Sequence, residues 1–304
     1  MRPLIQRLGY LVVDAIDPHA AARDTVNIVG ARIVEEGPDS VALSSNQRHA
    51  ELIIRKGTAN ALVRCGLEAT SAAAVEQVRA NCEAAGLRIL STEPSLPGIE
   101  AAVTFTTSEG HVFEVHTPMS ADRPARYHGP GAHPRALDHV NFTAVDPRAW
   151  ADEMQAACGL LLSERTTGYE LAWLRAADGR HHTVAVVQSH SPGIHHMSWE
   201  FPSFDDFKNL ADALIPDARK LTWGPGRHGA GDNLFLYFAD SADFLIECVA
   251  EMEVIDDEAA PGRISAAGEN LSNWRVVNQW GALPPTEWVE HHSPLAALAE
   301  DRAA

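Results

Sequence analysis

The sequence of 304 residues contains few cysteines and no long apolar run. Its four cysteines form no CxxC pair, which argues against a zinc finger or a disulfide framework and favours buried thiols in a reducing compartment. No apolar stretch approaches the roughly 18 residues that a membrane-spanning helix needs. The N-terminal segment also lacks the long apolar region and the small-residue cleavage site of a signal peptide. We therefore expect a cytoplasmic protein.

Basic residues are scarce as well. Lys and Arg number 24 against 41 Asp and Glu, which gives a formal net charge of −17 at pH 7. Nucleic acids and anionic membrane surfaces attract clustered cations, so the composition argues against both as partners. Hydrophobic residues make up 45% and charged residues 21% of the chain, which argues against a disordered chain and predicts a filled core.

One pattern occurs twice along the chain. Three pairs of landmarks in strand-like segments lie 129, 132 and 133 residues apart, and such a nearly constant offset is hard to obtain by chance. The pairs are Tyr10 with His139, Arg64 with His196, and Glu114 with Glu247. The pattern predicts two modules, residues 1–125 and 126–252, joined by a segment rich in Pro, Gly and His and followed by a tail at 253–304.

Within each module the hydrophobic period changes from that of a strand to that of a helix and back. In the second module, alternation predicts the strands and helical spacing predicts the helices, one of them capped by Asp146 before Pro147. The expected strands cover residues 136–145, 169–175, 182–187, 194–201, 234–238 and 244–249, and the expected helices cover 147–158 and 203–215. Together these units indicate an α+β fold of tandem βαβββ modules whose strands curve around a site.

Three polar residues occupy core positions of the predicted strands: His139, His196 and Glu247. A buried carboxylate without a partner costs free energy, so Glu247 between two apolar neighbours needs an explanation. Two imidazoles and one carboxylate that face inward form the ligand set of non-haem Fe(II) sites, which leaves three coordination positions open. Each residue alone would more often be a hydrogen-bonded structural residue, but their matched landmarks favour a shared metal.

The first module carries Tyr10, Arg64 and Glu114 at the matching landmarks. A guanidinium group stays protonated and cannot bind a divalent cation. We therefore expect the first module to be metal-free and the second to hold the metal.

Several motifs resemble those of one known family. They are Leu137-Asp138-His139-Val140-Asn141, Gly193-Ile194-His195-His196 and Gly224-Pro225-Gly226-Arg227-His228-Gly229, followed by Leu236-Tyr237-Phe238 and Glu247. Over nearly its whole length the chain resembles the type I extradiol ring-cleaving dioxygenases of the vicinal oxygen chelate superfamily, and within them the homoprotocatechuate and catechol 2,3-dioxygenase branch. The tryptophans of the tail resemble the C-terminal lid segment of homoprotocatechuate enzymes.

The resemblance implies that His139, His196 and Glu247 bind Fe(II), with Mn(II) as the less frequent alternative. It implies a small aromatic diol and O₂ as the reactants, and a homo-oligomer, either a tetramer or a dimer. The chemistry of the residues agrees, because a catecholate would fill two of the open positions and O₂ the third.

The resemblance also assigns four residues around the metal. His182 would be the acid–base residue that assists O₂ activation, and the resemblance in spacing to His196 favours it over His181. Tyr237 would donate a hydrogen bond to the substrate oxygen, His228 would line the substrate side and Asn141 the O₂ side. A histidine that titrates near neutrality and a phenol donor suit proton transfer and a developing oxyanion. Without the family, Tyr237 would be a core aromatic, His228 a turn residue and Asn141 a hydrogen-bonded strand amide.

The sequence departs from the family at one informative position. Homoprotocatechuate enzymes carry an Arg directly before the glycine-rich stretch, where it meets the substrate carboxylate, and this chain has Trp223 there. We therefore expect a neutral, bulkier catechol, with Trp173, Trp199 or Trp223 stacking on it. Each of these tryptophans could instead belong to the core.

The expected function is extradiol ring cleavage in aromatic hydrocarbon catabolism, which gives a muconic semialdehyde-type product. The same metal ligands would also suit an enzyme that cleaves an aminophenol or a hydroquinone. An O₂-independent isomerase or lyase of the superfamily is a further alternative, but it would not need His182, Tyr237 and His228 together. A metal-free binding module is disfavoured, because it would replace the ligand residues by apolar ones.

Overall fold

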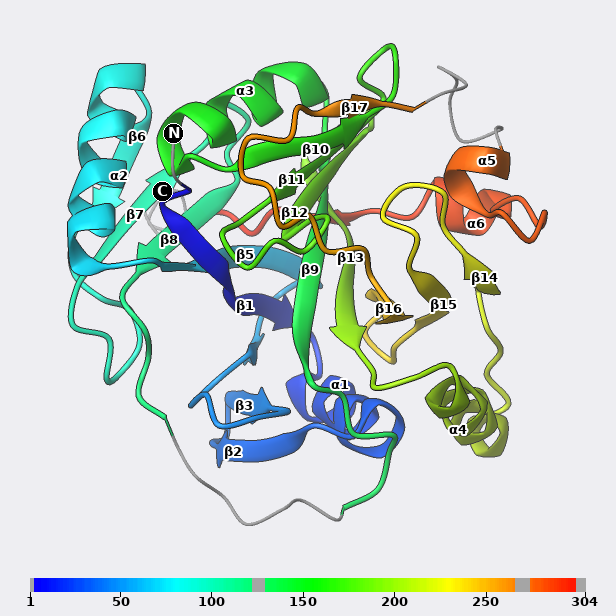
Figure 1. The fold of residues 1–304 in the computed structure, drawn as a ribbon. Coiled ribbons are helices and arrows are strands. Elements are labelled where there is room, and N and C mark those ends of the chain that lie inside the picture. Colours follow the sequence, from blue (N-terminus) through cyan, green and yellow to red (C-terminus); the bar gives the residue numbers. More distant parts are fainter. Residues whose placement is uncertain (1–2, 122–128, 266–273, 299–304) are drawn as a thin grey trace.

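The computed structural model describes residues 3–121, 129–265 and 274–298. The fold consists of two twisted sheets, one from each half of the chain, with helices packed against them (Figure 1). This architecture is the α+β class of two modules that the sequence predicts. The boundary at residue 125 lies outside the described residues, and the division at 252 stays a prediction.

The first sheet has the strand order β2-β3-β4-β1-β5-β8-β7-β6. Its strands are β1 (Ile5–Ala15), β2 (Arg32–Glu36), β3 (Ser40–Ser44), β4 (Leu52–Lys56), β5 (Ala61–Ala69), β6 (Arg88–Ser91), β7 (Ala102–Thr106) and β8 (Val112–His116). Its helices are α1 (Pro18–Asp24), continued by η1 (Thr25–Val29), and α2 (Ala72–Ala85).

The second sheet has the order β14-β15-β16-β13-β9-β12-β11-β10-β17, and β18 pairs with β13 off this path. Its strands are β9 (Ala136–Ala144), β10 (Leu161–Arg165), β11 (Leu171–Arg175), β12 (Val184–Gln188), β13 (Gly193–Glu200), β14 (Trp223–Arg227), β15 (Leu234–Ala239), β16 (Leu245–Ala250), β17 (Arg263–Ile264) and β18 (Ser293–Pro294). The helices of this half and its tail are α3 (Pro147–Cys158), α4 (Asp205–Leu214), continued by η2 (Ile215–Asp217), α5 (Trp274–Val277) and α6 (Thr286–Val289). Each sheet thus contains the βαβββ order twice.

The strand register relates the two sheets residue by residue. The equivalent partners are Val12 with Arg64 and Asn141 with His196, and then Gly66 with Glu114 and Ser198 with Glu247. The offsets between these pairs are again 129, 132 and 133 residues. Pairing in a sheet fixes which side chains share a face. The landmark residues of the two modules therefore occupy equivalent positions in their two sheets.

The helix predictions agree with the structure where a capping signal is present. Helix α3 covers the predicted residues, and Oδ1 of Asp146 accepts a hydrogen bond from the N–H of Ala149 at 3.0 Å. The strands differ from the prediction in several places. Residues 161–165 form β10, where the sequence pattern predicts no strand. Strand β12 begins at Val184, so His182 lies in the loop before it. Residues 223–227, which have no strand pattern, form β14, because pairing with β15 outweighs the low strand propensity of the glycines.

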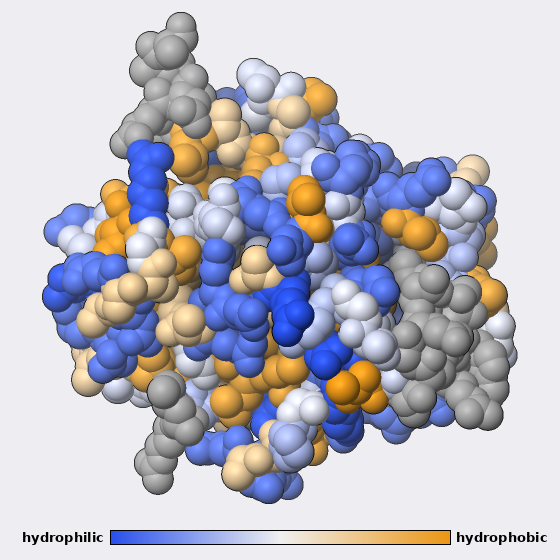
Figure 2. Space-filling view, turned by 90° about the horizontal axis from the view of Figure 1, so that it is seen from above, coloured by the Kyte–Doolittle hydropathy of each residue, from blue (hydrophilic) through white to orange (hydrophobic). Residues whose placement is uncertain are grey.

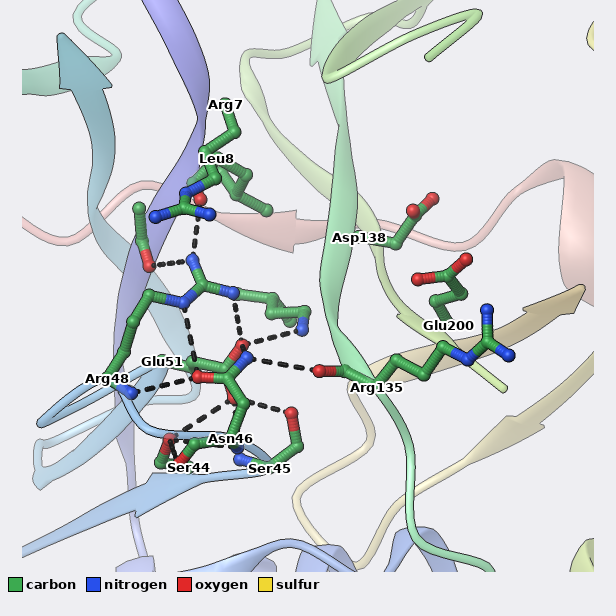
Figure 3. A network of polar contacts seen from close by, with 12 residues as sticks. Arg7, Leu8, Ser44, Ser45, Asn46, Arg48, Glu51, Arg135, Asp138 and Glu200 are labelled. Carbon is green, nitrogen blue, oxygen red and sulfur yellow. Dashed lines mark hydrogen bonds and ion pairs between the residues drawn. The ribbon is translucent and has the colours of Figure 1, made fainter. Parts of the chain in front are cut away.

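A buried carboxylate joins the modules near the second sheet. Glu51 forms an ion pair with Arg48 and accepts a hydrogen bond from the N–H of Leu137 at 3.0 Å (Figure 3). Arg48 in turn donates to the backbone carbonyl of Leu8 in β1 at 2.7 Å. The network therefore fixes β1 against β9 two residues before His139. Because Arg48 and the N–H of Leu137 both donate to the buried carboxylate of Glu51, its charge has hydrogen-bond partners at this contact between the modules.

Hydrophilic and hydrophobic residues are mixed on the surface. On the face seen in Figure 2, hydrophilic residues lie between and around the hydrophobic ones. Exposed apolar side chains such as Ile16, Ile215 and Trp280 belong to separate elements. Within the described residues, no helix combines the length and apolar character that crossing a bilayer requires.

A second contact between the modules is the buried imidazole of His111, which directly precedes β8. Its Nε2 lies 3.0 Å from the carbonyl oxygen of Thr143 in β9, so Nε2 carries the proton and donates. The ring packs edge-on against Phe142 and Trp150. Burial lowers the pKa of His111 to about 4, so the folded protein holds this side chain neutral at neutral pH.

This histidine should make the fold sensitive to acid. Its folded-state pKa lies below the unfolded value of 6.5, so only the unfolded chain gains the proton between those pH values. The free energy of unfolding contributed by His111 is therefore complete above about pH 6.5 and falls by about 3 kcal/mol as the pH drops toward 4. Urea unfolding of the protein and of His111→Gln at several pH values measures this. The variant should lose less stability between neutral and acidic pH, and an equal loss would show that other groups cause the acid sensitivity.

Candidate metal centre

Three adjacent strands bring His139, His196 and Glu247 together. They lie on β9, β13 and β16, which are neighbours in the second sheet, and all three side chains are buried. Their ligand atoms lie within 4.8 Å of one another. Oε2 of Glu247 is 2.7 Å from Nε2 of His139 and 3.3 Å from Nε2 of His196. Residues 57 and 51 positions apart in sequence thus converge through strand pairing alone.

A hydrogen-bond contact at Nδ1 orients the imidazole of each of the two histidines. Nδ1 of His139 lies 2.7 Å from a carboxylate oxygen of Asp138, whose second oxygen is 2.6 Å from Nη1 of Arg180. Nδ1 of His196 lies 2.7 Å from Nδ1 of His195. With Nδ1 occupied, neutral imidazoles turn the lone pair of Nε2 toward Glu247. Three lone pairs at one point repel each other unless a cation lies among them, so the donor set fits a divalent metal.

The charges of the three side chains also favour a bound cation. Burial lowers the pKa of His139, but the carboxylates of Glu247 and Asp138 outweigh it and raise the pKa to about 9. Burial lowers the pKa of His196 to about 4. Burial alone would raise the pKa of Glu247, yet the facing imidazoles hold it well below its usual range. The site therefore attracts a positive charge, and metal binding would replace the proton on His139.

His182 lies beside this group, in the loop before β12. Its ring centroid is 4.2 Å from that of His139, and it lines the same cavity. Burial and the neighbouring imidazoles of His139 and His181 hold its pKa well below the usual value, so His182 is neutral at pH 7. Its Nδ1 lies 3.0 Å from Nδ1 of His181, which leaves Nε2 for the cavity.

Tyr237 and His228 lie on the other side of Glu247. The Tyr237 hydroxyl donates to Oε1 of Glu247 at 2.6 Å, and burial with that carboxylate raises its pKa well above the usual value. Nε2 of His228 is 3.1 Å from the Tyr237 oxygen and 3.2 Å from Oε1 of Glu247. The imidazole stacks on Phe235 with the ring centroids 3.9 Å apart. All three polar groups border the same cavity.

Asn141, Trp173 and Trp223 also line the cavity, and their contacts with O₂ and substrate stay predictions. Oδ1 of Asn141 is buried and receives no hydrogen bond within the described residues. Trp199 does not line the cavity. It lies in the hydrophobic core, and its indole is fully buried there. Its expected contact with substrate is therefore corrected, because Trp199 points to the opposite side of β13 from His196 and Ser198.

The tail contributes residues that the sequence could not assign. Val276, Val277 and Trp288 line the cavity, and Trp288 packs at 4.9 Å from Trp223 and 5.4 Å from Tyr237 between ring centroids. The tail therefore covers the site of its own chain. The signals in the sequence were the resemblance of the tail tryptophans to the C-terminal lid segment of the family and their apolar character, which does not suit a free segment.

The first module shows what the same positions do without a metal. The Tyr10 hydroxyl donates to Glu114 at 2.8 Å, in the place where His139 faces Glu247. The guanidinium carbon of Arg64 lies 5.8 Å from the centroid of the Tyr10 ring. The hydroxyls of Tyr10 and Thr104 satisfy this carboxylate, and the guanidinium of Arg64 lies over the phenol ring, so these residues do not fit a metal.

Comparison with known proteins follows this geometry. No protein-family model matches the chain. An iron-dependent extradiol dioxygenase from Rhodococcus jostii is 26% identical over 301 residues, which covers 91% of this chain and 96% of the relative. The chain is thus similar in sequence to an extradiol ring-cleaving dioxygenase over most of its length. Metapyrocatechase 2 from Cupriavidus necator is 29% identical over 197 residues, and the chain spans only 61% of its length.

Solved structures show the same fold. Homoprotocatechuate 2,3-dioxygenase from Brevibacterium fuscum superimposes with a TM-score of 0.86 at 21% identity, over 98% of this chain and 84% of that protein. A Mn(II)-bound glyoxalase from Novosphingobium aromaticivorans gives 0.84 at 23% identity, over 98% and 99%. The resemblance seen in the motifs and the vicinal oxygen chelate fold are thereby confirmed.

The two equivalent carboxylates provide a matched test. Glu247→Gln should lower the metal content severalfold or more, because the amide removes the only negative charge among the three ligand atoms. Glu114→Gln should leave the metal content unchanged, since its partners are Tyr10 and Thr104. Metal analysis of both variants after loading with Fe(II) measures this. A loss of metal in Glu114→Gln with the fold intact would place a metal in the first module.

Proposed function

We propose that the protein is an extradiol dioxygenase that cleaves a catechol ring next to its diol and incorporates both atoms of O₂. The observation that carries this proposal is the convergence of His139, His196 and Glu247 beside a neutral His182 on one cavity. The similarity to extradiol dioxygenases in sequence supports it. In this proposal the three residues bind Fe(II), with Mn(II) as the alternative.

The bound metal would lower the pKa of a coordinated hydroxyl and hold catecholate and O₂ in contact. His182 accepts a substrate proton at Nε2 and later returns it, which suits an imidazole that is neutral at pH 7. The Tyr237 hydroxyl and Nε2 of His228 border the substrate side, where they orient the catechol oxygen. Asn141 also lines the cavity, with an Oδ1 that accepts no hydrogen bond from the described residues, and we assign it to the O₂ side.

The walls of the cavity favour a neutral substrate. They include Leu171, Trp173, Val276 and Trp288, and no Arg or Lys is among the described residues that line it. A substrate carboxylate would therefore lie in an apolar pocket without a cation. Trp223 occupies the position where the family has its carboxylate-binding Arg. We propose catechol or an apolar substituted catechol as the substrate class, with Trp173 and Trp223 against the ring.

The setting of the protein is part of this proposal. All four cysteines are free and buried, which suits a reducing compartment such as the cytoplasm. The homo-oligomeric state follows from the family resemblance and stays a prediction.

The first test is oxygen uptake. After anaerobic purification and loading with Fe(II), we expect catechol, 4-methylcatechol or 2,3-dihydroxybiphenyl to consume one O₂ per molecule under air and to give a yellow product. An oxygen electrode and the visible spectrum record this. Uptake only with 2-aminophenol or hydroquinone would change the substrate class. Turnover of a glyoxalase substrate without any O₂ uptake would instead support an isomerase or lyase.

His182→Phe separates proton transfer from metal binding. The variant should keep close to one metal per chain, because His182 is not among the three ligand residues, while ring cleavage falls by about 10²- to 10⁴-fold. Metal analysis and initial rates measure the two effects. His19→Phe, a change far from the cavity, is the matched control and should alter neither. Loss of metal together with activity would make His182 part of the metal site instead.

Trp223→Arg tests the substrate class. The new guanidinium should raise kcat/KM for 3,4-dihydroxyphenylacetate relative to catechol by about tenfold or more, since a charge-assisted pair would form in a dry cavity. Trp223→Phe controls for the lost indole volume and should leave this ratio near that of the unchanged protein. If the unchanged protein already prefers the carboxylate-bearing catechol, a neutral substrate is wrong.

A further inference from the structure

Two pairs of neighbouring histidines contact each other in the same way. His195 and His196 approach through their Nδ1 atoms at 2.7 Å, and His181 and His182 do so at 3.0 Å. In each pair the second histidine borders the cavity, and the first lies behind it, fully or almost fully buried. Neighbouring residues on a strand usually point to opposite faces, so a side-by-side contact of this kind requires a local irregularity. A register shift between Ile194 and His196 provides it in β13.

The outer partner of the first pair determines where its protons lie. Nε2 of His195 is 2.9 Å from the backbone carbonyl of Trp288 in α6. A carbonyl oxygen only accepts, so Nε2 of His195 carries the proton, and in a neutral ring its Nδ1 is left as an acceptor. Nδ1 of His196 must then donate to it. The remaining nitrogen of His196, Nε2, keeps its lone pair toward Glu247, which is the form that a metal ligand requires.

We propose that His195 is a positioning residue that transmits the hydrogen bond of the Trp288 carbonyl to His196 and so fixes the metal-binding tautomer of that ligand. This inference rests on the proposed metal centre. As a consequence, the tail and the metal stabilise each other. If the tail leaves the site, the carbonyl of Trp288 no longer accepts from His195, and the tautomer of His196 is no longer fixed. By reciprocity, bound metal must tighten the packing of α6 to the same extent.

In the second pair, a carboxylate takes the place of the backbone carbonyl. Nε2 of His181 faces Oε2 of Glu164 at 3.5 Å, and Ser265 donates to Oε1 of the same carboxylate at 2.9 Å. This is an ion-pair distance rather than a hydrogen bond, and because a carboxylate only accepts, it favours the proton of His181 on Nε2, with Nδ1 accepting from Nδ1 of His182. Nε2 of His182 is thus left as a base facing the cavity. The two pairs therefore order different functions, metal binding in one and proton transfer in the other.

The test compares matched variants with Mn(II) as the probe. His195→Phe removes the acceptor for His196 and should weaken Mn(II) binding by about 10- to 100-fold, the usual effect of losing such a partner. His195→Gln keeps a carbonyl that accepts and an N–H that donates, so its affinity should be closer to that of the unchanged protein. His181→Phe should leave the affinity within about twofold but lower kcat for the catechol with little change in KM. Electron paramagnetic resonance of free Mn(II) measures the affinity, and circular dichroism confirms folding.

Hydrogen exchange provides an independent measurement that does not depend on catalysis. Mn(II) should slow exchange in residues 286–290 of the unchanged protein and of His195→Gln, but much less in His195→Phe. Equal Mn(II) affinity in His195→Phe and the unchanged protein would overturn the inference, as would a metal effect on exchange that persists in that variant. If the protein binds Mn(II) but cleaves no catechol, only the proposed function fails, and the affinity comparison still stands. If it binds no metal, both fail.

Discussion

The negative charge of Glu247 is the constraint on which the second module depends. The carboxylate is buried, and an isolated charge in such a position would cost several kcal/mol. One oxygen receives the hydrogen bond of Tyr237, and the other faces the imidazoles of His139 and His196. Only a positive charge among these groups satisfies them together. A proton on His139 provides it without a metal, and a divalent cation provides it better, since it binds all three atoms.

The supports of the metal ligands extend well beyond the site. Asp138 connects His139 to Arg180, and His195 connects His196 to the tail. Glu51 fixes the start of β9 from the first module. Because each ligand is held by a group from a different part of the chain, the metal centre is sensitive to changes at the module junction and in the tail. Local stability and metal affinity are therefore linked through ordinary hydrogen bonds.

The two modules show how one strand register supports two different sites. In both, a glutamate on the third strand after the second helix faces a residue on the first strand. In the first module, Tyr10 donates to Glu114 and Arg64 supplies a fixed cation nearby. In the second, imidazoles replace them and leave the positive charge to be supplied from outside. The fold determines the position of the carboxylate, and the neighbouring side chains determine whether a metal is required.

The sequence by itself determined the class of fold, the repeat and the residues of the triad, because strand alternation and the constant spacing of the landmarks can both be read along the chain without knowing which elements pair. Helix α3 was predictable to the residue, since Asp146, Pro147 and Gly159 mark its ends. The tertiary structure alone decided that β14 is a strand, that Trp199 belongs to the core and that Trp288 closes the cavity. Each of these depends on packing against another element, β15 for β14 and β13 for the tail, and composition and periodicity do not record which elements pack together.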